Sequence, residues 1–399
     1  MDMAKPKIRF KGYTDEWEQR KLGDFTWDAG KRNKEDLELE PYAITNEHGF
    51  IRQRDAHDDF GYMKDTDRKA YNIVQPNSFA YNPARINVGS IGYYKGVENV
   101  IVSSLYEVFQ TDNYVNDRFL WHWLKSDEFP RWIEKLQEGS VRLYFYYDKL
   151  CECQLYMPSL EEQEKIASFL DGLDHLITLH QRKCEQAKKL KKYMLQKMFP
   201  QNGQKVPEIR FKGFTDDWEQ RKLGEIITEY KETVDSDCTL PILTSSKTEG
   251  VILQEEHFGR KQQHDITGYN ILPRNYCTYR NRSDGVDFTF NINKCCDKGI
   301  ISKFYPVFSG KNSDVFFLSL VLNNSDEVVR EIAYTCTGTG QKVLSFLDLQ
   351  KMKVRVPNFD EQKEIAAYFE SLDHLITLHQ QKCDELKNIK KFMLQNMFM

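Results

Sequence analysis

The chain has 399 residues, of which 40% are hydrophobic and 29% are charged, and its formal net charge is -4. This length is too great for one hydrophobic core, so we expect at least two globular domains. No apolar run approaches the ~20 residues of a membrane span, and the start MDMAKPK lacks the apolar stretch of a secretory signal. The composition therefore predicts a cytoplasmic protein without a membrane partner.

The nine cysteines are scattered along the chain and form no CxxC pair. Their odd number argues against a disulfide framework, and their spacing offers no zinc site. We therefore expect free thiols and no metal on this chain.

The first segment in chain order, residues 6–24, returns almost unchanged as residues 207–225. A second pair of segments, residues 157–199 and 356–398, is identical at more than half of its positions, including the unbroken run LDHLITLHQ. Such self-similarity shows a duplicated unit of about 200 residues with nearly constant ends and variable middles. Two similar modules suit an internal pseudo-two-fold axis and a target that has two halves.

The first variable region mixes short apolar runs with turn residues. Runs at 71–74, 78–81, 99–102 and 105–109 are rich in β-branched and aromatic residues and predict strands. Apolar residues at three-to-four spacing over 119–136 predict one helix, or two that are interrupted at Pro130. The second variable region keeps this order of elements, with a strand near Tyr279 and a helix over 315–321.

The two constant segments that end the repeats are the clearest helices, each about 40 residues and so ~60 Å long. Their apolar positions form a narrow seam that includes Ile177, Cys184 and Leu190 in the first helix and Ile376, Cys383 and Ile389 in the second. A long helix with such a seam seldom stays single, so we expect the two copies to pair antiparallel.

The predicted fold class is therefore α+β, with two mixed α/β domains separated by an antiparallel two-helix coiled coil. The expected bounds are 1–156 and 208–355 for the domains, 157–199 and 356–399 for the helices, and 200–207 for the linker, which contains Asn-Gly and two prolines.

The twin blocks FKG(Y/F)TD(E/D)WEQRKLG, at 10–23 and 211–224, resemble the DNA-specificity subunit of Type I restriction-modification systems. So do the twin segments at 158–163 and 357–362, which open Lys-rich helices ending in MLQxMF. The resemblance covers essentially the whole chain. It implies two target-recognition domains, each reading one half of a split double-stranded DNA target, held apart by the constant helices.

The same resemblance implies a chain that is not an enzyme by itself. In that family the helices dock two methyltransferase subunits, to which restriction and translocase subunits bind. Cofactors would belong to those partners, as S-adenosylmethionine, ATP and Mg²⁺, with none on this chain. The residues agree, because Asn82–Arg85 (NPAR) is only a partial match to the (D/N/S)PP(Y/F) element of adenine methyltransferases.

Reading DNA requires Lys and Arg for phosphates, with Arg, Asn, Gln and aromatic residues near base edges. The densest candidates follow the two equivalent strands that end near Tyr81 and Tyr279. The full set of candidate DNA-binding residues is Lys64, Arg68, Lys69, Asn82, Arg85, Tyr93, Lys95, Arg142, Arg260, Arg274, Arg280, Asn281, Arg282, Gln341 and Lys342.

Two other readings stay open at this point. The acidic net charge favours a non-DNA coiled-coil adaptor with two protein-binding domains. An enzyme that uses His or Cys in the variable regions is the other, although no set of nucleophile, base and orienting group stands out.

Overall fold

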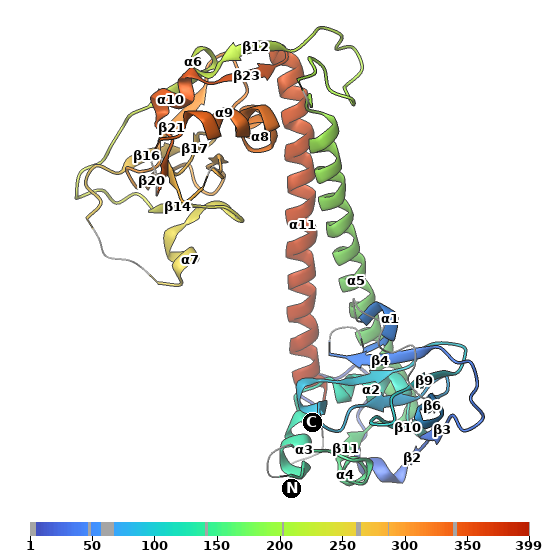
Figure 1. The fold of residues 1–399 in the computed structure, drawn as a ribbon. Helices are drawn as coiled ribbons and strands as arrows, with labels where there is room; N and C mark the ends of the chain where they lie inside the picture. Colours follow the sequence, from blue (N-terminus) through green and yellow to red (C-terminus); the bar gives the residue numbers. More distant parts are fainter. Residues whose placement is uncertain are drawn as a thin grey trace. The chain divides into compact units, whose positions relative to one another are not determined.

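The computed structural model describes residues 5–46, 49–56, 68–139, 143–201, 203–260, 265–285, 287–337 and 341–398. The chain divides into two compact units, Met1–Gln181 with Gln380–Met399, and Arg182–His379. Both units mix helix and sheet, and the two longest helices, α5 (Leu160–Lys197) and α11 (Phe359–Met397), contribute a segment to each (Figure 1). Because the division passes through these helices, the expected domain bounds stay a prediction.

The first unit contains a four-stranded antiparallel sheet, β2-β10-β7-β8, and a five-stranded sheet, β3-β6-β9-β4-β5, in which β4 and β9 run parallel. Strand β1 pairs with β11 beside them. The bounds are β1 Glu18–Lys21, β2 Thr26–Asp28, β3 Lys31–Arg32, β4 Pro41–Thr45, β5 Gly49–Arg52, α1 Gln53–Ala56, β6 Asn72–Val74, β7 Phe79–Tyr81, β8 Ile91–Tyr93, β9 Val100–Val102, β10 Glu107–Thr111, α2 Asp117–Leu124, α3 Glu128–Leu136, α4 Tyr147–Glu152 and β11 Gln154–Met157.

The four predicted strands of this unit are confirmed as β6, β7, β9 and β10. The region 119–136, for which we predicted one helix or two, forms two helices, and the break between them lies before Pro130. Helix α2 ends at Leu124, and Pro130 lies in the first turn of α3, where a missing N–H removes no helical hydrogen bond. The Asn116 side chain caps α2 by accepting from the backbone N–H groups of Arg118 and Phe119.

The second unit has a four-stranded antiparallel sheet, β13-β21-β17-β19, with four further strand pairs around it. The predicted helix over 315–321 is confirmed as α8. The bounds are β12 Glu219–Lys222, α6 Leu223–Ile226, β13 Ile227–Tyr230, β14 Leu243–Ser246, β15 Gly250–Leu253, α7 Gln254–Phe258, β16 Asn270–Pro273, β17 Cys277–Thr278, β18 Arg282–Ser283, β19 Asn291–Ile292, β20 Lys298–Ile301, β21 Val307–Gly310, α8 Val315–Asn324, α9 Asp326–Thr335, β22 Lys342–Val343, α10 Phe346–Lys351 and β23 Lys353–Val356.

Helices α5 and α11 pack against each other antiparallel within each unit. In the second unit Lys191 pairs with Asp373, and the Cys184 thiol donates to the Ile376 carbonyl at 3.8 Å. In the first unit Lys390 pairs with Asp174. The expected antiparallel pairing of the two long helices is thus present in both units.

The predicted seam is wrong at two equivalent positions. Leu190 is 43% exposed and Ile389 is 37% exposed. Lys191 and Lys390 lie seven residues after the buried Cys184 and Cys383, so they occupy the next position of the heptad repeat that faces the other helix, and each pairs with an Asp there. Because Leu190 and Ile389 each lie one residue before these lysines, their side chains point away from the other helix and into solvent.

Among the described residues, no helix is both long and apolar enough to cross a lipid bilayer.

Candidate nucleic-acid interface

In the first unit a cleft of about 880 Å³ opens where strand β7 ends. The Asn82 side chain accepts from the Ala84 N–H at 3.0 Å, and the Arg85 N–H donates to the Asn82 carbonyl, also at 3.0 Å. This tight turn leaves the Arg85 side chain exposed at the cleft. The cleft is lined by Asn82, Pro83, Ala84, Arg85, Asn87, Ser104, Leu105, Glu107, Leu143, Tyr144 and Tyr146.

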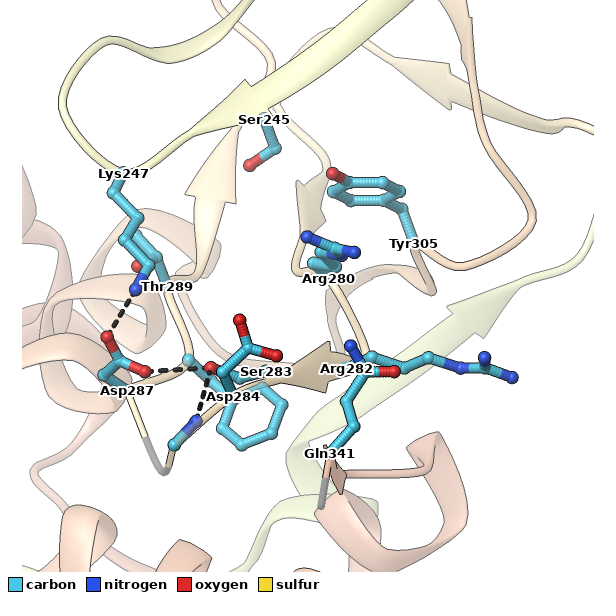
Figure 2. Close-up of a pocket in the computed structure, with 12 residues that line it drawn as sticks. Ser245, Lys247, Arg280, Arg282, Ser283, Asp284, Asp287, Thr289, Tyr305 and Gln341 are labelled. Carbon is cyan, nitrogen blue, oxygen red and sulfur yellow. Dashed lines mark hydrogen bonds and ion pairs between the residues drawn. The ribbon is translucent and has the colours of Figure 1, made fainter.

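In the second unit a pocket of about 600 Å³ opens beyond strand β17 (Figure 2). Lys247 and Asp287 form an ion pair on one side of it, and Arg282 and Gln341 lie on the other. The Arg282 guanidinium stacks over the Phe304 ring, 4.6 Å from its centre. The remaining lining residues are Ser245, Arg280, Ser283, Asp284, Gly285, Phe288, Thr289 and Tyr305.

The two hollows occupy the same place in the repeat. The Phe145 N–H donates to the Pro83 carbonyl at 3.1 Å, and the Leu344 N–H donates to the Asn281 carbonyl at 3.0 Å. Isolated bridges Glu138–Tyr144 and Thr337–Val343 close the equivalent loops beside them. The backbone frame is thus repeated, whereas the side chains that face each hollow differ.

Five of the sequence-predicted residues line these two hollows: Asn82 and Arg85 in the first unit, and Arg280, Arg282 and Gln341 in the second. Two more lie beside the second pocket. Lys342 pairs with Ser283 between strands β22 and β18, and the Asn281 N–H donates to the Phe304 carbonyl at 2.9 Å. Each unit thus gathers part of the expected set around one hollow.

Other predicted residues lie outside the hollows. Arg68 and Lys69 precede β6, where Lys69 lies 3.7 Å from Asp36, and the exposed Arg260 follows α7. Arg274 pairs with Asp297 at 2.8 Å. Two more, Lys64 and Arg142, lie outside the described residues.

Tyr93 and Lys95 belong to another neighbourhood of the first unit. The Tyr93 hydroxyl donates to Asp117 at 2.9 Å, and the Arg118 guanidinium lies over its ring. Lys95 is exposed, yet desolvation and the nearby Arg118 lower its pKa. These contacts indicate an ion network next to α5 rather than the wall of the cleft.

That network centres on Asp171 of α5. The carboxylate pairs with Arg118 and accepts from the buried His122 Nε2 at 3.0 Å. Burial opposes its ionisation, but the hydrogen bonds from His122 and Arg118 outweigh that effect and hold the pKa of Asp171 well below its usual range. Asp171, Asp174 and His122 lie close enough to hold a metal, but Arg118 and Lys390 already neutralise the two carboxylates.

Sequence reasoning missed several lining residues. Tyr144 and Tyr146 stack with ring centres 5.6 Å apart, while Phe145 between them is fully buried. Accessible and buried side chains thus alternate over these three residues, but the run YFYY is aromatic throughout, so the sequence does not indicate which face is exposed. Lys247, Glu107 and Tyr305 reach the hollows from distant parts of the chain, so no local pattern identified them.

Comparison with known proteins gives three findings. The family model for the Type I restriction modification DNA specificity domain matches twice, over residues 14–189 and 215–388. The Type I restriction enzyme MjaVIII specificity subunit of Methanocaldococcus jannaschii is 23% identical over 402 residues, covering 94% of this chain and 91% of that protein. A crystal structure of the S subunit of a Type-I restriction-modification system from M. genitalium shares the fold, with a TM-score of 0.60, 13% identity and 99% coverage of both chains.

These matches span both repeats and favour DNA specificity over a protein-binding adaptor. The relatives are specificity subunits, which bear no catalytic site or catalytic cofactor of their own. Two copies of a DNA specificity domain on one mixed α and β chain with two long helices therefore lead to one assignment: the chain belongs to the family of Type I restriction modification DNA specificity subunits.

Proposed function

We propose that this chain recognises a split double-stranded DNA sequence, with each unit reading one half through its hollow. The observation that carries the proposal is the repeated position of the two hollows on one backbone frame, lined by different side chains. A repeated frame with changed contact residues suits two half-sites of different sequence. Paired constant helices would fix the spacing between the half-sites, as their 38 and 39 residues of continuous helix suit a spacer.

Contacts in the two hollows divide by chemistry. Exposed Arg and Lys side chains such as Arg85 and Lys247 suit phosphate or guanine, and Asn82 and Gln341 suit adenine. The remaining predicted residues, Lys64, Arg68, Lys69, Tyr93, Lys95, Arg142, Arg260, Arg274, Asn281 and Lys342, belong to the proposal as candidates for the outer DNA surface.

The long helices present two equivalent apolar patches that suit two identical partners. In the first unit Leu176, Ile389 and Phe392 are 41%, 37% and 55% exposed. In the second unit the repeat-related residues Leu375, Leu190 and Tyr193 are 43%, 43% and 49% exposed. Exposed large apolar residues that recur at equivalent positions mark interaction sites. Two methyltransferase subunits would dock there, one on each patch, and restriction subunits would join through them.

In this assembly the chain supplies specificity in the cytoplasm, and the partners supply the chemistry with S-adenosylmethionine, ATP and Mg²⁺. Selection from a random duplex pool tests the proposal. The chain is co-purified with its methyltransferase subunit, and bound duplexes are sequenced. Enrichment of two short sequences at a fixed separation is expected. A complex that binds duplex DNA with no enriched sequence contradicts the proposal.

A further inference from the structure

One of the residues that line the first cleft, Glu107, is acidic, and the proposed contacts do not use it. It stands at the start of β10, opposite Tyr81 of β7, and it lines the cleft with Asn82 and Arg85. Its side chain is half-buried. Among the residues that the structure describes, no side chain or backbone group makes a hydrogen bond or ion pair to this carboxylate.

On balance, the surroundings of Glu107 disfavour its charged form. Burial raises the pKa of the carboxyl, and the nearby Asp28 and Asp148 raise it further, whereas the nearby Arg32 lowers it by a smaller amount. In the second repeat the same place in the strand is taken by Pro306, whose carbonyl accepts from the Thr278 hydroxyl at 2.8 Å. The acid is therefore particular to the first cleft and is no requirement of the shared fold.

A carboxylate in a DNA-facing cleft repels phosphates, so it suits only a group that donates hydrogen bonds. On the base edges of the major groove the exocyclic amino groups, cytosine N4 and adenine N6, are the donors, and Glu characteristically accepts from cytosine N4. An ionised carboxyl offers acceptors alone, which rejects guanine O6 and thymine O4 at the same place.

We infer that Glu107 is a specificity-determining residue that accepts a hydrogen bond from the exocyclic amino group of one base, cytosine first, in the half-site read by the first unit. Arg85, exposed on the turn after β7, lines the same cleft and offers a positive charge to the phosphates that the carboxylate would repel. The inference rests on the proposed function and names a base group that the first cleft selects.

The test uses the complex of this chain with its methyltransferase subunit and the two-part target that the wild-type complex selects. Duplexes are made in which each cytosine or adenine is replaced in turn by 2-pyrimidinone or purine, which lack the exocyclic amino group. At one position of one half-site, the wild-type complex should lose about 10- to 100-fold in affinity. Glu107→Ala should bind the natural target as weakly as wild type binds that modified duplex, and the modification should cost it less than about twofold more.

Glu107→Gln keeps the shape of the side chain and adds an amide donor, so it should admit adenine at the selected position. Glu98→Gln makes the same charge change on an exposed residue outside the cleft, and it should leave all affinities unchanged. The inference is overturned if Glu107→Ala has the thermal midpoint of the wild type, and so is folded, yet loses as much affinity as the wild type when each exocyclic amino group is removed from the duplex. If the wild-type complex selects no two-part target, the proposed function fails instead.

Discussion

Arg9 and Glu162 join the start of the chain to the first turn of α5 through two parallel hydrogen bonds, at 2.7 and 2.8 Å. The pair is buried, with 12% of the Arg9 side chain and 1% of the Glu162 side chain exposed. Arg210 and Glu361 repeat the arrangement in the second unit, with both hydrogen bonds at 2.7 Å. The constant blocks of the two repeats are thus tied to the starts of the constant helices.

Glu162→Gln should destabilise the first unit by about 3–5 kcal/mol, because it leaves the buried Arg9 guanidinium without its counter-charge. Urea denaturation of the purified chain measures the loss. Glu164→Gln is the matched control, because Glu164 is an exposed glutamate two residues further along α5. This change should alter the free energy of unfolding by less than about 0.5 kcal/mol. Equal effects of the two changes would show that the ion pair has no special role.

Phe398→Ala should cost about 3–5 kcal/mol of stability. The ring is 5% exposed and packs against Phe119 at 5.3 Å between centres, in the same core as Trp17.

Phe392→Ala, on the exposed apolar patch of the first unit, should leave the thermal midpoint unchanged but weaken association with the methyltransferase subunit. Copurification and thermal melts separate the two effects, and a destabilised Phe392→Ala chain would argue against the docking assignment.

Arg85→Ala and Arg282→Ala should each weaken binding of the complex to its selected target. The expected loss is about 1–3 kcal/mol if the arginine reads a base, or a decrease of about 1 in the salt slope if it holds a phosphate. Fluorescence anisotropy over a salt series gives both quantities. Arg131→Ala removes an exposed arginine of α3 and serves as the control. If affinity and salt slope both stay at wild-type values, the arginines do not contact DNA.

His122 should make stability depend on pH. Burial lowers the pKa of its imidazole, and the hydrogen bond to Asp171 offsets only part of that effect. As pH falls through the unfolded value near 6.5, the unfolded chain therefore takes up a proton that the folded chain refuses. The free energy of unfolding should then fall by at most about 1.4 kcal/mol per pH unit from this group.

His122→Leu, which introduces the residue that the second repeat carries as Leu320, should remove that part of the pH dependence. Urea midpoints of the wild type and the variant at pH 7.5, 6.5 and 5.5 provide the comparison. Parallel curves for the two proteins would show that His122 titrates alike in the folded and unfolded states.

Local patterns were enough to predict the duplication, the long helices and strands such as β7 and β10, because each depends on residues close in sequence. The seam at Leu190 and Ile389 was mispredicted because Lys191 and Lys390 find carboxylates on the other helix, which is a tertiary effect. The residues that line the hollows were predicted only in part. Asn82 and Arg282 could be predicted because they closely follow a predicted strand, whereas Glu107 and Lys247 are distant from them in sequence and come close to them only in the folded chain. Tyr93 was predicted as a DNA-binding residue from its sequence position, but its side chain contacts Asp117 and Arg118, which are 24 residues or more away in sequence.

Sequence recognition by this chain can be tested by co-expressing it with its methyltransferase subunit and mapping N6-methyladenine across the host genome. We expect one split motif that is methylated only when this chain is present, with Arg85→Ala affecting one half of the motif and Arg282→Ala the other. An intact complex with S-adenosylmethionine available and no methylated motif would contradict the claim that this chain selects DNA sequence.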